Sequence, residues 1–134
     1  MNGPVTIQGA RSWLLEVHDR EPLLMNAERN KHWSERHADT RAWRNTIAWL
    51  AKAQRIPRLA HVVVDVEHDH GKPRGRVPDV GAVFPQVKAA IDGLVDAGVL
   101  EHDGPPHVIA VVFASPIRAE RHRLAIRVHE VLVA

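Results

Sequence analysis

The sequence predicts a small α+β protein with one domain, built from a mixed sheet and two main helices. The chain has 134 residues, enough for one domain with a real hydrophobic core. Apolar residues make up 45% and charged residues 25%, as in ordinary globular proteins. Segments with strand and helix periodicity follow one another in the order strand, helix, strand, helix, strand, strand. We find no repeat, low-complexity tract or linker, so residues 1–134 are expected to form a single domain.

The first half of the chain predicts two strands and one helix. Residues 13–17 are mostly apolar and predict the first strand. Residues 26–37 are polar and irregular, and a helix is expected from position 39 or 40 to position 54, closed by Pro57. Residues 61–67 alternate in strand fashion. The apolar face of the helix recurs with spacings of four, three and one residues at Trp43, Ile47, Leu50 and Ala51.

The second half predicts a loop, a helix and two more strands. Residues 68–78 are polar and rich in glycine and proline, which indicates a loop. Pro85 suits the first turn of a helix, and Gly98 suits the left-handed residue just after its end. Residues 107–114 and 124–129 predict the last two strands. The buried stripe of the second helix is expected at Val87, Ile91, Leu94 and Val95.

Charge and composition narrow the functional classes only loosely. The net charge of +2 is small, although the isoelectric point of about 9.5 favours a nucleic-acid partner. The absence of cysteine excludes disulfides and thiolate zinc sites, and fits a cytoplasmic protein. The apolar runs are too short to span a bilayer, and the N-terminus has no signal-peptide pattern, so we expect no membrane association.

The most informative stretch is residues 75–103, where two aspartates flank a helix that carries one lysine. Asp79 precedes the helix, Lys88 lies on it and Asp103 follows it. Ten helical residues from Lys88 to Gly98 rise about 15 Å, and five extended residues cover at most about 17 Å. A chain that doubles back can therefore return Asp103 to the level of Lys88.

This convergence would suit phosphodiester chemistry. Carboxylates are preferred Mg²⁺ ligands, and a nearby lysine stabilises charge on a phosphate. The alternative is that Asp79 and Asp103 are ordinary turn residues, and that Lys88 forms only a surface pair with Asp92. Spacing alone leaves both interpretations open.

Basic residues and tryptophans gather in and before the first helix. Such a surface can hold phosphates and stack on unpaired bases. The alternative is a solvated helix face with core tryptophans, which we expect for Trp43 and Trp49, whereas Trp33 stays open. Arg74 and Arg76, in the glycine- and proline-rich loop, are candidates for contacts with the DNA backbone. The basic set consists of Arg29, Lys31, Arg36, Arg41, Arg44, Lys52, Arg55 and Arg58.

The segment His68-Asp69-His70 offers two potential metal ligands. A short polar loop with two histidines is more typical of a solvated loop, and a structural zinc site needs four ligands. We therefore do not count these residues among the predicted site residues.

Several segments together resemble the RusA family of Holliday-junction resolvases, including forms carried by actinobacterial phages. The last segment matches most specifically, because it is long and free of gaps and an acidic turn follows it. The segments are residues 22–26 (PLLMN), 32–33 (HW), 40–44 (TRAWR), 57–59 (PRL) and 85–100 (PQVKAAIDGLVDAGVL).

The resemblance implies a homodimeric, Mg²⁺-dependent endonuclease that cuts four-way DNA junctions symmetrically during recombination and repair. By position, Asp79 matches the first aspartate of the family's Asp-x-Asp-Asn motif, Lys88 its helix lysine and Asp103 the second member of its Asp-Asp pair. These three are the candidate catalytic residues, with Asp79 and Asp103 as Mg²⁺ ligands. The DNA-binding candidates are Arg74, Arg76, Lys31, Arg36, Arg41 and Arg44.

Three positions depart from the family pattern. Gly81 and Ala82 stand where the motif has its second aspartate and its asparagine, and His102 replaces the first aspartate of the pair. A lost carboxylate lowers the expected Mg²⁺ affinity, and Asp92 is the candidate that could compensate. The sequence thus supports two functions, an active junction endonuclease or a protein that binds branched DNA without cutting it efficiently.

Overall fold

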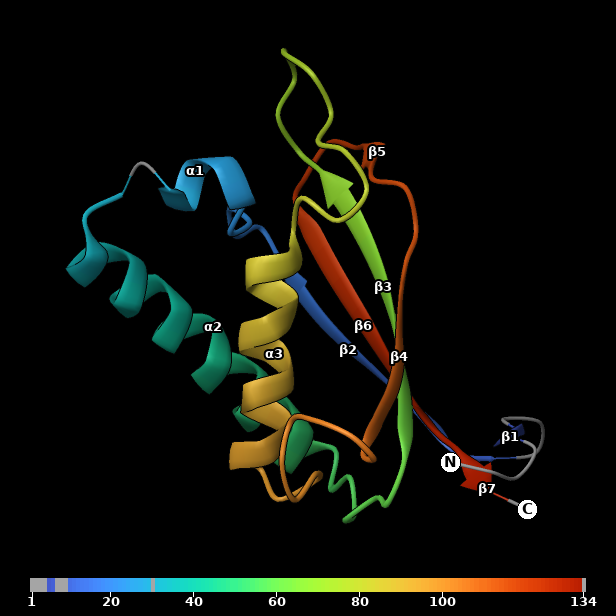
Figure 1. Cartoon of the computed structure of the whole chain (residues 1–134). Helices are drawn as coiled ribbons and strands as arrows, with labels where there is room; N and C mark the ends of the chain where they lie inside the picture. Colours follow the sequence, from blue (N-terminus) through green and yellow to red (C-terminus); the bar gives the residue numbers. More distant parts are fainter. Residues whose placement is uncertain (1–4, 7–9, 30, 134) are drawn as a thin grey trace.

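Five strands form one mixed sheet, and two long helices cover one of its faces (Figure 1). The computed structural model describes residues 5–6, 10–29 and 31–133. This α+β arrangement and its element order confirm the fold class that the sequence predicts. The elements are β1 (Val5–Thr6), β2 (Ser12–His18), α1 (Met25–Arg29), α2 (Trp33–Ala53), β3 (Val62–His70), α3 (Phe84–Asp96), β4 (Val108–Phe113), β5 (Ile117–Arg118), β6 (Arg123–Glu130) and β7 (Leu132–Val133).

The sheet has the order β2-β6-β3-β4, and β5 continues along the β4 edge of β3. Strand β6 runs antiparallel to both β2 and β3, whereas β4 and β5 run parallel to β3. The register pairs Val64 with Val128 and Val66 with Ile126. A separate two-stranded pairing joins β1 to β7. None of the helices in the described part of the chain is both long and apolar enough to cross a bilayer.

The hydrophobic core lies between the sheet and the helices α2 and α3. Every second residue of β3, beginning with Val62, points toward the helices and is buried. Helix α2 contributes Trp43 and Ile47, and α3 contributes Val87 and Leu94, all nearly inaccessible to solvent. The apolar residues that recur with strand periodicity and those that recur with helix periodicity therefore pack together in one apolar layer.

Helices α2 and α3 pack closely because α3 has a glycine at their contact. A Cβ on Gly93 would lie 2.5 Å from the carbonyl oxygen of Arg44 and 3.1 Å from the Cβ of Ile47. No other residue type fits this contact without a shift of one helix. The close approach sets Arg44 beside the C-terminal half of α3.

The structure extends two of the predicted elements. Helix α2 begins at Trp33, about two turns before the predicted start, and the ring of His32 caps it by accepting the Ser34 N–H at 3.2 Å. Strand β3 continues to His70, so the histidines at its end belong to the sheet rather than to a loop. A short helix, α1, also overlaps the start of the segment that the sequence predicts to be irregular.

One core prediction is wrong. Trp43 is buried as expected, but Trp49 is 68% exposed. The two residues are six positions apart, which is about 600° of helical rotation, so they lie on different faces of α2. Trp33 is also exposed, at 61%.

Candidate functional site

The exposed edge of α3 carries a line of charged side chains. Lys88, Asp92 and Asp96 are spaced four residues apart and therefore lie on one side of the helix. The Lys88 ammonium lies 3.1 Å from a carboxylate oxygen of Asp92 and also forms an ion pair with Asp103. We call these four residues, together with Arg44 of α2, the α3 charge cluster.

Asp103 reaches Lys88 because the chain folds back after α3. Gly98 adopts a positive φ of 80°, which ends the helix and turns the backbone. Val99 and Leu100 are then buried, and the Val99 N–H donates to the carbonyl of Leu94 at 3.0 Å. These contacts return Asp103 along the helix. The structure thus brings together Lys88 and Asp103, as the reach of the chain allows.

Within the α3 charge cluster, each charged group stabilises the ionised form of its oppositely charged neighbour. The hydrogen bond from Lys88 lowers the pKa of the Asp103 carboxyl below its ordinary value. The same bond raises the pKa of Lys88. Both side chains are therefore fully ionised at neutral pH, with two carboxylates sharing one cation.

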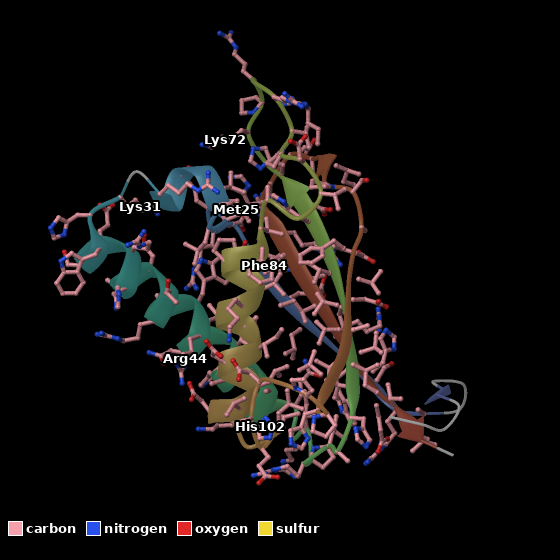
Figure 2. All side chains as sticks on the ribbon, viewed as in Figure 1. Met25, Lys31, Arg44, Lys72, Phe84 and His102 are labelled. Atoms are coloured by element: carbon pink, nitrogen blue, oxygen red, sulfur yellow. The ribbon has the colours of Figure 1, made fainter. Side chains whose placement is uncertain are left out.

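Arg44 closes the cluster from the side of α2, where that helix crosses α3 (Figure 2). Its guanidinium binds Asp96 at two points, with Nε–Oδ2 2.5 Å and Nη2–Oδ1 2.7 Å. This hydrogen bond lowers the pKa of Asp96 and raises that of Arg44. The negative charges of Asp92 and Asp103 also raise the pKa of Arg44. The Arg44 guanidinium is thus paired with a carboxylate of α3, although the sequence predicts Arg44 as a DNA contact.

Among the described contacts, none joins Asp79 to this group. Its carboxylate is largely exposed, and the contact that the structure describes for it is with the Arg76 guanidinium at 3.2 Å. Two turns fix the loop, because the Asp79 carbonyl accepts the Ala82 N–H at 3.1 Å and the Gly81 carbonyl accepts the Phe84 N–H at 3.0 Å. Of the three predicted catalytic residues, two meet and Asp79 remains at the N-terminal end of α3.

The loop before α3 also packs against α1. The Met25 N–H donates to the Ala82 carbonyl at 2.9 Å, and Figure 2 labels Met25 and Phe84, the first residues of α1 and α3. Gly81 has a φ of +85°, and a Cβ built there would meet no atom within 4 Å. A carboxylate at this position would therefore find room but would need a strained backbone.

The predicted DNA-binding residues form two groups. The first lies along α2, where Lys31 pairs with Asp39 at 2.7 Å and where Arg36 and Arg41 line a groove together with Arg44. The second is the loop after β3, where Arg74 and Arg76 are exposed. The residues that line the groove are Arg36, His37, Thr40, Arg41, Arg44, Asn45 and Asp96.

Arg118 is a positioning residue that the sequence does not indicate. Its guanidinium donates to the carbonyl of Lys72 at 2.6 Å and also to the carbonyl of Gly75. It thereby holds the loop that carries Arg74 and Arg76. Because the contacts are to backbone carbonyls far along the chain, no local pattern could predict them.

The carboxylates of the α3 charge cluster supply the oxygen ligands that Mg²⁺ prefers. Asp92 and Asp103 direct oxygens at one cation, and Mg²⁺ commonly takes one or two carboxylates and keeps its waters. Across the described ranges, however, the group of three ligand side chains close enough to share one ion is His68, His70 and His122 rather than a set of aspartates.

Comparison with known proteins gives no family assignment. No family model matches the chain, and no curated protein matches it significantly. The resemblance to RusA resolvases therefore stays a prediction.

Proposed function

We propose that the protein is a Mg²⁺-dependent endonuclease that resolves four-way DNA junctions by hydrolysing phosphodiester bonds. The observation that carries this proposal is the bridge from Lys88 to both Asp92 and Asp103, next to a groove lined by arginines. Carboxylates, a cation and a phosphate-binding surface are the parts that such hydrolysis needs.

Asp103 and Asp92 are the residues that would hold Mg²⁺ at α3. When bound, the ion would polarise a phosphoryl oxygen and lower the pKa of a coordinated water. Asp79 is the third proposed ligand, from the loop before the helix. Its ion pair with Arg76 is solvent-exposed and is worth less than about 1 kcal/mol, so the carboxylate can be redirected at little cost.

Lys88 has two roles in this proposal. In the free protein its single positive charge is shared by the two carboxylates and keeps Asp103 in place. With DNA bound, its ammonium stabilises the negative charge that develops on the phosphate. Its raised pKa keeps it protonated over the whole neutral range, as this role requires.

DNA binding is assigned to the groove along α2 and to the loop after β3. Lys31, Arg36 and Arg41 would contact phosphates beside the α3 charge cluster, with Arg44 held by Asp96 at its edge. Arg74 and Arg76 would contact the backbone of a second duplex arm. The exposed Trp33 and Trp49 are suited to stacking on unpaired bases at the branch point.

Symmetric cutting of two strands needs two equivalent sites, so we propose a homodimer with twofold symmetry. Cytoplasmic placement, in a bacterial or phage-infected cell, fits both DNA access and a chain without cysteine. A monomeric mass by light scattering, with and without junction DNA, would contradict the dimer.

A second function is a protein that binds branched DNA but cuts it poorly. It is favoured by the position of Asp79, whose described partner is Arg76 rather than the α3 charge cluster. Gly81, Ala82 and His102 add to this, because each stands where the resemblance expects a carboxylate or an amide.

The test uses a labelled synthetic four-way junction and a linear duplex of the same sequence. Binding and nicking are scored separately, with Mg²⁺ and with EDTA. The endonuclease proposal expects paired nicks in the junction with Mg²⁺ only, whereas the second function expects tight junction binding without nicks. Equal, weak binding to both DNAs would contradict both proposals.

A further inference from the structure

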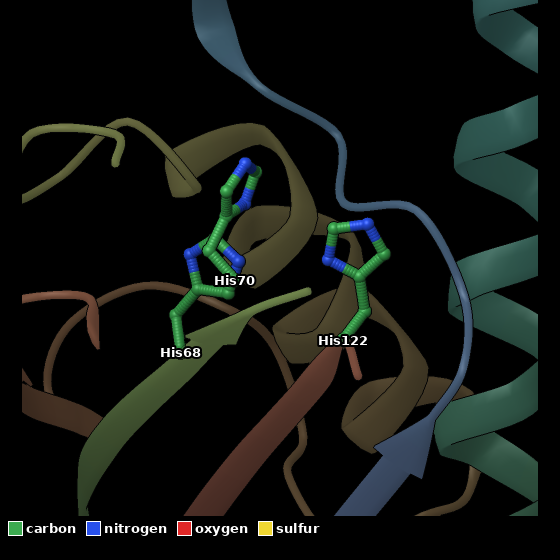
Figure 3. A group of neighbouring side chains, drawn as sticks. All are labelled: His68, His70 and His122. Atoms are coloured by element: carbon green, nitrogen blue, oxygen red, sulfur yellow. The ribbon is translucent and has the colours of Figure 1, made fainter. Parts of the chain in front are cut away.

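Three histidines, two from a strand and one from just before another strand, lie side by side at the end of the sheet that carries the long loop (Figure 3). His68 and His70 are at the end of β3, and His122 directly precedes β6. One ring nitrogen from each lies within 4.8 Å of the others. The ring centroids are 5.3 Å apart for His68 and His70 and 5.0 Å apart for His70 and His122.

The backbone brings these rings together in two ways. Residues two apart on a strand share a face, so His68 and His70 both point to the side covered by α3. Gly71 then lets the end of β3 touch the start of β6, because a Cβ there would lie 2.3 Å from the backbone nitrogen of His122. The Gly71 N–H also donates to Nδ1 of His122 at 3.0 Å.

Two of the three rings are buried, yet several of their nitrogens have no hydrogen-bond partner within the described part of the chain. His68 is 3% exposed and His70 4%. Both nitrogens of His68 and the Nδ1 of His70 are unpartnered. Buried polar groups almost always have a partner, so a cluster of unpartnered nitrogens calls for one.

Burial also favours the neutral form of His68 and His70, which is the form that binds metals. Desolvation, and then the nearby His70 and His122, lower the pKa of His68 to about 4. Desolvation likewise lowers the pKa of His70. Neutral imidazole is the form that coordinates a metal ion.

We propose that His68, His70 and His122 bind one transition-metal ion of the Zn²⁺ class, at a site separate from the α3 charge cluster. A set of imidazole nitrogens suits Zn²⁺, Co²⁺, Ni²⁺ or Cu²⁺ and does not suit Mg²⁺, which prefers oxygen ligands. Tetrahedral bonds of about 2.0–2.1 Å place ligand nitrogens about 3.3 Å apart, so the rings need to close by about 1.5 Å or less. Metal binding at Nδ1 of His122 replaces its bond from Gly71.

Three protein ligands leave the fourth position for water or another ligand. The ion would fasten the end of β3 to the start of β6, at the base of the loop that carries Arg74 and Arg76. Bound metal should therefore raise the melting temperature, because it binds the folded chain in preference to the unfolded one. This inference does not depend on the proposed endonuclease activity.

The test is a titration of the full chain, stripped of metal with EDTA, with Zn²⁺ in a calorimeter. We expect one ion per chain and a higher melting temperature, and Co²⁺ should give the visible absorption band of tetrahedral coordination. Zn²⁺ should abolish that band, whereas Mg²⁺ should not change it. A stoichiometry other than one, or the absence of a tetrahedral Co²⁺ band, would overturn the proposal.

Variants locate the ion. His68→Gln and His122→Asn should each weaken Zn²⁺ binding about tenfold or more, and the exposed His18→Gln is the matched control with no expected effect. Asn at position 122 can still accept the Gly71 N–H, so this variant separates metal binding from folding. If His68→Gln does not fold, His122→Asn and the Co²⁺ spectrum of the parent decide. Unchanged affinity in a folded His122→Asn protein would overturn the site.

Discussion

Lys88 and Asp103 form an ion pair across a turn, although they are fifteen positions apart in the chain. Both side chains are nearly half exposed, so the pair adds less than about 1 kcal/mol to stability. The main effect of the pair is to position side chains, because it holds a carboxylate and an ammonium next to Asp92. Function should therefore be more sensitive to this pair than folding is.

Replacing Lys88 should separate these two effects. Lys88→Ala is expected to slow Mg²⁺-dependent nicking of a four-way junction roughly 10²–10³-fold, the usual loss for one electrostatic stabiliser. The free energy of unfolding should change by less than about 1 kcal/mol. Single-turnover nicking and urea denaturation measure the two quantities. Arg11→Ala is the control, since it removes a surface cation paired with Glu130; equal nicking by both variants would count against the role of Lys88.

The Arg44–Asp96 pair should show a defined pH dependence. The pKa of Asp96 is lowered by Arg44, so the pair stabilises the fold above the ordinary value of 3.8, and this contribution is lost as the pH falls through the lowered pKa. At pH 7, Asp96→Asn should cost about 0.5–1 kcal/mol. Denaturation at neutral pH and well below 3.8 tests this. A stability difference that persists in acid would show that the ion pair is not its cause.

Gly93 should be required for the approach of α2 to α3. Gly93→Ala is expected to destabilise the fold by about 1–3 kcal/mol, because its Cβ would meet the Arg44 carbonyl, despite the better helix propensity of alanine. Thermal denaturation measures the effect. Gly104→Ala is the control, since the nearest atom to a Cβ there is 3.9 Å away. A Gly93→Ala protein as stable as the parent would mean that the helices are not in close contact.

Gly81 should limit cleavage if the missing carboxylate matters. Gly81→Asp is expected to raise Mg²⁺-dependent nicking while costing about 1–2 kcal/mol of stability, because φ at this position is +85°. Gly81→Asn has the same backbone strain without the charge, and should lose stability without faster nicking. Rates are compared over a range of Mg²⁺ concentrations at equal folded fraction. A folded Gly81→Asp protein no faster at any concentration would show that another group is limiting.

The fold was predictable wherever apolar residues recur with a clear period. The sequence predicts β3 and β6 from their alternating apolar residues. It also predicts the ends of α3, from Pro85 and Gly98. The first two turns of α2 were not predictable, because they extend away from the sheet and carry no apolar face (Figure 1). Trp49 is exposed, although tryptophan is usually buried, because its position on the helix points it away from the buried face of Trp43.

The site was predictable only as far as local geometry reaches. The return of Asp103 to Lys88 follows from helix rise and chain length. The position of Asp79 depends on the turns of its loop and on its ion pair with Arg76. The spacing of residues in the sequence predicts neither of them. His122 joins His68 and His70 through strand pairing and the close approach at Gly71, so the two-histidine segment alone could not predict a third ligand.

The most direct test of the endonuclease proposal is the cleavage of a labelled four-way junction by Asp103→Asn. With Mg²⁺ present, this variant should lose nicking by about 10²-fold or more, because a carboxylate needed for the metal ion is gone. Junction binding should stay equal or become tighter, since repulsion of the phosphate is relieved. Asp19→Asn, which changes an exposed aspartate paired with Arg121 rather than with Lys88, should cut like the parent. If Asp103→Asn cuts the junction at the parental rate, the proposed site is wrong.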